Sequence, residues 1–84
     1  MADPVETIEI DEQADAAYAR VSPATVARTQ EITDGLILDF DRDDEVVGIE
    51  VLGLRKRIGS SDPQSYLRGL IVGLRLRQLH PSLD

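Results

Sequence analysis

The chain has 84 residues and a formal net charge of −7, with 42% hydrophobic and 30% charged residues. This length fits a single domain, residues 1–84, and the apolar fraction argues against a wholly disordered chain. Cysteine is absent from the sequence, which excludes disulfides, thiolate metal sites and thiol nucleophiles.

The acidic balance opposes binding to the phosphates of nucleic acids. The sequence has no apolar run near the ~20 residues of a membrane span, and its first residues lack a signal-peptide pattern. We therefore expect a cytoplasmic protein that binds neither membrane nor nucleic acid and needs no cofactor.

The charges are unevenly distributed along the chain. Residues 1–50 contain fourteen acidic residues and three arginines, which sum to −11. Residues 51–84 contain six basic and two acidic residues, which sum to +4. This asymmetry favours contact between the acidic region of one copy and the basic region of another. The alternative is a solvated surface that keeps the protein soluble.

Much of the first two thirds of the chain alternates polar and apolar residues with the period of two that is typical of β-strands. We expect strands at residues 7–10, 16–21, 25–32, 36–40 and 46–54, separated by polar turns. The alanines of residues 16–21 weaken the second prediction, because alanine favours helix. The segment 25–32 is mostly polar and is expected near an edge of the sheet.

The dipeptide Asp34-Gly35 is a hairpin signal, because the turn needs a positive φ that glycine tolerates. The following strand places Leu36, Leu38 and Phe40 on one face. Short polar connections favour antiparallel neighbours, so residues 6–54 are predicted to form an antiparallel β-meander.

Residues 55–61 are expected to be a strand exit and a linker. Asp62 followed by Pro63 is typical of a helix start, and the helix is predicted to run to about Leu79. The predicted fold class is therefore α+β: an antiparallel sheet of four or five strands with one C-terminal helix at residues 62–79.

This helix has two apolar stripes. Leu67, Leu70, Ile71 and Leu74 form the first stripe, which would cover the sheet. The second stripe contains small and apolar residues that need another surface: Gly69, Val72, Gly73, Leu76 and Leu79. We predict that these residues form the interface of a homodimer. The alternative is a sheet that wraps around both sides of the helix.

The order of motifs from Ile10 to Leu52 is similar to that of a family of short prokaryotic proteins, domain of unknown function 2283. The similar motifs are Ile10-Asp11-Glu12-Gln13-Ala14-Asp15-Ala16-Ala17-Tyr18, Thr29-Gln30-Glu31, Asp34-Gly35, Asp39-Phe40-Asp41 and Val47-Gly48-Ile49-Glu50-Val51-Leu52. Ile10 stands where the family usually has tyrosine, and the turn after Asp41 lacks the usual glycine.

This resemblance covers about half of the chain and implies a compact β-meander. It implies no chemistry, because the activity of the family is unassigned, and it does not cover the C-terminal helix. Members of the family resemble antitoxin-like partners in being small and acidic.

A group of carboxylates is the site-like feature of the sequence. Asp39, Asp41 and Asp43 occupy alternate positions, and Glu50 follows eleven residues after Asp39. This spacing resembles a calcium-binding loop, although Asp44 stands where such a loop requires glycine. Asp11, Asp39, Asp41 and Glu50 could instead serve a small metal-dependent enzyme. The alternative is that they are turn and surface residues that face water.

The sequence favours a non-enzymatic interaction module that forms a homodimer, and it predicts no catalytic residue. Two alternatives stay open. One is an acidic, antitoxin-like partner of another small protein, and the other is a small metal-dependent enzyme that uses the clustered carboxylates.

Overall fold

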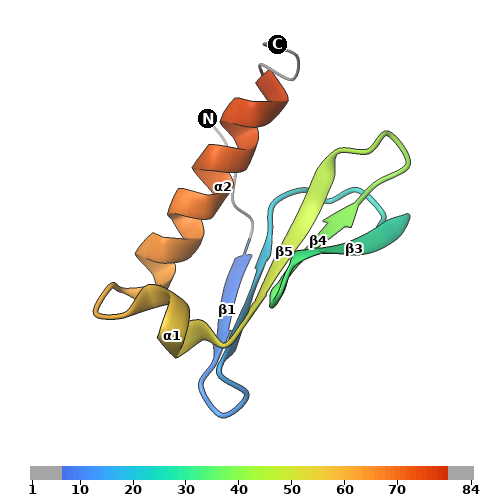
Figure 1. Ribbon diagram of the computed structural model, residues 1–84. Helices are drawn as coiled ribbons and strands as arrows, with labels where there is room; N and C mark the ends of the chain where they lie inside the picture. Colours follow the sequence, from blue (N-terminus) through green and yellow to red (C-terminus); the bar gives the residue numbers. More distant parts are fainter. Residues whose placement is uncertain (1–6, 80–84) are drawn as a thin grey trace.

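The computed structural model describes residues 7–79, and the side chains of residues 7–75. Within residues 7–79, five strands precede two helices, which confirms the α+β class (Figure 1). The strands are β1 (Thr7–Asp11), β2 (Ala16–Arg20), β3 (Arg28–Thr33), β4 (Leu36–Phe40) and β5 (Val46–Leu52). The helices are α1 (Leu54–Ile58) and α2 (Pro63–Leu79).

The five strands form one antiparallel sheet in the order β1-β2-β5-β4-β3. Two units make up this order: the hairpin β1-β2 and the meander β3-β4-β5. The meander joins the hairpin through β5, which pairs with both β2 and β4. The predicted turn at Asp34-Gly35 connects β3 to β4, and Gly35 has a φ of 79°. The strand β3 lies at an edge and is exposed along its whole length, as its polar sequence predicts.

The alanines of β2 lie in the core of the domain. Ala17 and Ala19 belong to the same buried cluster as Leu67 and Ile71 of α2, with Ile49 of β5. Small side chains leave room for a helix to cross the sheet closely, so tertiary packing overrides the helix preference of alanine here.

The helix α2 begins as the sequence predicts. The Asp62 carboxylate accepts a hydrogen bond from the Ser65 backbone amide at 3.0 Å, and Pro63 occupies the first helical position. Leu67 and Ile71 are buried against the sheet. The helix lies on one side of the sheet near β1, whereas β3 and β4 form the far half of the sheet (Figure 1). Among the helices described, none has the length and apolar character needed to cross a membrane.

The predicted linker at residues 55–61 is partly wrong, because α1 occupies Leu54–Ile58. Gly53 has a φ of 64°, a left-handed conformation that ends β5 and turns the chain into the helix. The first amides of α1 are then satisfied from a distant turn, since Leu54 donates to the Asp15 carbonyl at 2.9 Å. The Asp15 carboxylate accepts from the Arg55 amide, also at 2.9 Å.

Candidate functional site

The predicted carboxylates lie on the sheet and in the turn between β4 and β5. Asp41 accepts hydrogen bonds from the backbone amides of Asp43 and Glu45, at 2.8 and 3.0 Å, so it holds this turn together. Asp43 is exposed in the same turn, and Glu50 lies on β5. Within residues 7–75, no three carboxylate or histidine side chains lie close enough together to hold a metal ion. The metal hypothesis therefore stays a prediction that this arrangement does not support.

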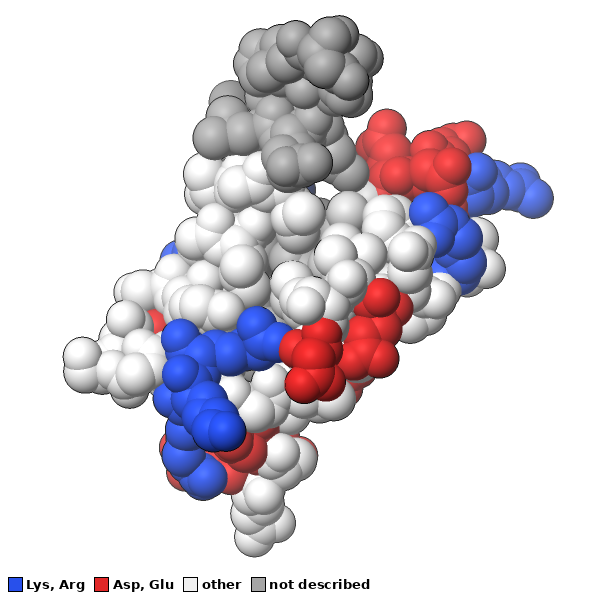
Figure 2. Space-filling view, viewed as in Figure 1, with Lys and Arg blue, Asp and Glu red and all other residues white. Residues whose placement is uncertain are grey.

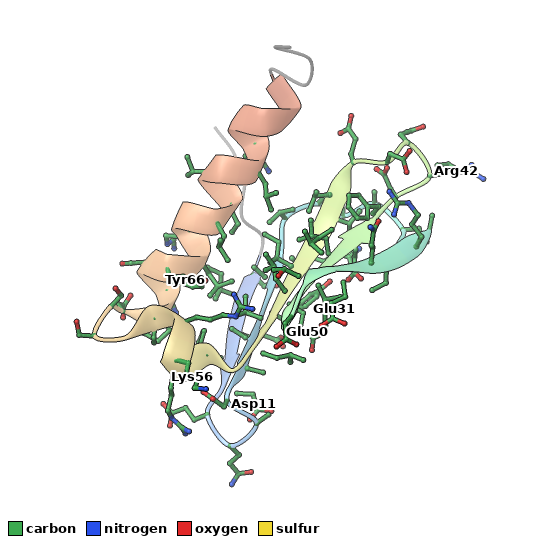
Figure 3. All side chains as sticks on the ribbon, in the orientation of Figure 1. Asp11, Glu31, Arg42, Glu50, Lys56 and Tyr66 are labelled. Atoms are coloured by element: carbon green, nitrogen blue, oxygen red, sulfur yellow. The ribbon has the colours of Figure 1, made fainter. Side chains whose placement is uncertain are left out.

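The sheet face opposite α2 is here called the open face, and residues of all five strands contribute to it. Register places Tyr18 opposite Glu50 and Glu9, while Ala19 and Ile49 point to the helix side. In Figure 3, Glu31 and Glu50 lie on the side of the strands turned away from α2. The open face is therefore mainly acidic.

A hydrogen-bonded network crosses the open face. The Tyr18 hydroxyl donates to Asp39 Oδ2 at 2.8 Å, and the Thr29 hydroxyl donates to Asp39 Oδ1 at 2.6 Å. Tyr18 reaches Asp39 across Gly48, where an added Cβ would lie 2.7 Å from Tyr18 Cζ. The network thus joins β2, β4 and β3 over the glycine of β5.

Burial raises the pKa of the Tyr18 hydroxyl above its ordinary value of 10.0. The hydrogen bond to Asp39 and the negative charge of that carboxylate act in the same direction, and Arg20 opposes them. Tyr18 is therefore protonated at neutral pH and acts as a hydrogen-bond donor. Because both oxygens of Asp39 accept hydrogen bonds, the arrangement serves to stabilise the sheet.

Sequence reasoning missed this network, although its residues occur in the motifs quoted above. The available signal was the pairing of a strand glycine with a nearby tyrosine, because a glycine in a strand often marks a close approach. Two other motif acids, Asp11 and Asp15, serve the turn between β1 and β2. Asp11 accepts a hydrogen bond from the Ala14 amide at 3.0 Å.

The second helix stripe is exposed where its side chains are described. Val72 is 56% exposed, the highest value among the large apolar side chains of residues 7–75. Gly69 and Gly73 flank it along α2, and a Cβ added to either would meet no atom within 4 Å. The side chains of Leu76 and Leu79 lie outside the described residues.

Charged side chains gather at the two ends of the domain. Figure 2 shows Lys and Arg over α1, acidic and basic side chains together over the turn between β4 and β5, and further acids on the sheet between these two ends. Lys56 and Asp11 lie at the α1 end, and Arg42 lies at the tip of the opposite turn (Figure 3). Arg57 of α1 is engaged, since it donates to the carbonyls of Leu52 and Asp34.

Residues 7–55 match a family model described as "Protein of unknown function (DUF2283)". Neither the curated proteins nor the solved structures contain a match to this chain.

Proposed function

Because the chain belongs to the DUF2283 family, whose description names no activity, we propose its function from its own surface. The protein is a non-enzymatic interaction module that forms a homodimer through the outer face of α2. This face contains Gly69, Val72 and Gly73, and the sequence extends it to Leu76 and Leu79.

The observation that carries this proposal is the exposed Val72 between two glycines that the monomer does not need. Glycine within a helix costs about 1 kcal/mol relative to alanine. Open space around Gly69 and Gly73 means that alanine would fit either position in a single chain. A second helix at close range would need these small residues, and it would remove Val72 from water.

The state of the carboxylates supports a role without catalysis. Asp39 accepts two side-chain hydrogen bonds, and Asp41 accepts two from the backbone. These acids therefore have structural partners within the fold. None of them is paired with an oriented histidine among the described residues, as a general base in a catalytic dyad would be.

Val72→Asp tests the proposal. An aspartate here would place a charge in the apolar centre of the interface, and burying it would cost solvation, so we expect the dimer to dissociate. Within the monomer the change is mild, because the introduced carboxylate would lie one turn from Arg68 and Arg75 on an exposed surface. Light scattering should report half the mass of the unchanged protein, with an unchanged circular dichroism spectrum.

Val26→Asp is the matched control, because Val26 is also an exposed valine but lies between β2 and β3. It should leave the dimer intact. Equal masses for the Val72→Asp variant and the unchanged protein would contradict the proposal.

A second candidate is an acidic partner of another small protein, which the open face favours. Among the described residues, Glu9 and Glu50 pair with no cation, although they lie on either side of Tyr18. Unpaired carboxylates on one face attract a basic partner. In this case the partner would bind to the open face, and Val72→Asp would leave the affinity for the partner unchanged.

A further inference from the structure

We propose that the second copy covers the far half of the helix side of the sheet with its own α2. This inference rests on the proposed homodimer and names the surface that receives the helix. Two copies would then form three layers: a sheet, a layer of two helices, and the second sheet.

The receiving surface is a groove between α2 and the far half of the sheet, here called the helix-side groove. Leu36 and Phe40 of β4 and Val46 of β5 point to the helix side, yet each is only partly buried. Leu70 and Leu74 of α2 are also only partly buried, and Leu74 lines a cavity together with Val46. Large apolar residues are thus incompletely covered across this surface, and the Arg28 guanidinium lies over part of it, 4.1 Å from the centre of the Phe40 ring.

The position of α2 explains why the groove is open. The helix lies near β1, and a single helix about 10 Å wide covers roughly two strands spaced about 4.8 Å apart. The far half of a five-stranded sheet is therefore only partly covered, and Leu38 is the residue of β4 that is buried in the core. At one end of the groove lies a cavity of about 250 Å³, whose apolar walls include Val46, Ile49, Ile71 and Leu74.

The α2 helix of a second copy would cover the groove and bury its own outer face at the same time. In a dimer with two-fold symmetry, each contact occurs twice, so the helix of each copy would enter the groove of the other. The outer face of each α2, with Val72 at its centre, would then rest on the partner's β4 and β5. Gly69 and Gly73 would allow the backbones of the two helices to approach closely.

Charge complementarity favours this occupant. The segment Pro63–Leu79 contains three arginines and no acidic residue. Residues 41–45, at one end of the groove, contain four acids and one arginine, a net charge of −3. Glu45 lines the cavity of the groove together with Arg75 of the same chain, and Asp44 is paired with Arg28, so Asp41, Asp43 and Glu45 carry the charge offered to a second copy. A basic helix entering an acidic-ended groove is favoured by these charges, and a second acidic sheet edge would be repelled.

Nuclear magnetic resonance on a mixed dimer tests the inference. Isotope-labelled and unlabelled copies of the full chain are mixed, and only nuclear Overhauser effects between copies are recorded. We expect cross-peaks between the Val72 methyl groups of one copy and Leu36, Phe40 or Val46 of the other. In one chain Val72 points away from the sheet, so these signals would not arise internally.

The outcomes separate this inference from the proposed function. Cross-peaks that join only the two helices would contradict the claim that α2 of one copy occupies the groove of the other. The proposed homodimer through α2 would still stand. A monomer at high concentration would overturn both. As a control, the Val26→Asp variant, which keeps the Val72 methyl groups, should retain the cross-peaks between copies.

Discussion

At position 48 a glycine lies in the middle of a paired strand, where it would ordinarily weaken the sheet. The structure accounts for it through the Tyr18 side chain, which occupies the space that a Cβ would need on its way to Asp39. The residue type at one position is thus determined by a side chain from the neighbouring strand.

Gly48→Ala should therefore destabilise the protein by about 1–2 kcal/mol, because Tyr18 must move and its hydrogen bond is lost. In a Tyr18→Ala background the same change should cost clearly less, since only Asp39 Oδ2, 3.1 Å from the added Cβ, stays close and alanine is less flexible than glycine. Urea unfolding of the four proteins measures this coupling. Equal costs in both backgrounds would show that Tyr18 is not the reason for the glycine.

Tyr18 should also make stability depend on alkaline pH. Its pKa is raised in the folded state, so its contribution is fully present below the unfolded value of 10.0. That contribution is lost as the pH rises through the folded pKa. The free energy of unfolding should therefore fall more steeply above about pH 10 in the unchanged protein than in Tyr18→Phe. Parallel profiles for the two proteins would contradict this account.

At this scale the sequence predicts which side chains share a face, but not which of them meet. Alternation assigns Asp39 and Gly48 each to one face of its own strand. The pairing of β4 with β5 then places these two residues opposite each other. The sequence does not predict that Tyr18 contacts Asp39, because this contact requires β5 to lie between β2 and β4. Strand order depends on contacts distant in the chain, and a periodic pattern does not contain them.

Among the elements, α1 depends most on a distant part of the chain. It has only five residues, which is too short to be stable alone. Its first amides are satisfied by Asp15, whose own φ is 54°. Arg57 attaches the same helix to the turn between β3 and β4 by donating to the Asp34 carbonyl. The helix therefore connects the two hairpin turns at one end of the sheet.

Asp15→Ala should lower the free energy of unfolding by about 2 kcal/mol, because it removes the acceptor for the Arg55 amide. It also places alanine at a positive φ, where alanine has no polar side chain to offset the steric cost. Asp15→Asn is the matched control: it keeps a side-chain oxygen and tolerates the left-handed conformation. It should lose less than half as much stability in thermal or urea unfolding. An equal loss in both variants would indicate that the charge of Asp15, rather than its hydrogen bond, matters.

The same element shows why sequence reasoning predicted a linker here. Five residues are too few to show the periodicity of a helix. The side chain that accepts a hydrogen bond from the first turn of α1 belongs to Asp15, 40 positions before Arg55. By contrast, α2 was predicted closely, since its start signal, its buried stripe and its length are all local.

For the whole molecule, composition and alternation predicted an antiparallel sheet with a C-terminal helix, and this fold is confirmed. The carboxylate site stays a prediction: Asp39 and Asp41 take part in different local structures, and no three acids of the described residues are grouped closely enough for a metal ion. A monomer with one helix over five strands leaves apolar surface on both the outer face of α2 and the far half of the sheet. Small domains commonly cover such surface by association.

The mass of the unchanged chain in solution tests this account most directly. Sedimentation equilibrium from low to high micromolar concentration should fit an association to twice the monomer mass of 9.3 kDa. A single species of 9.3 kDa across the whole range would contradict it.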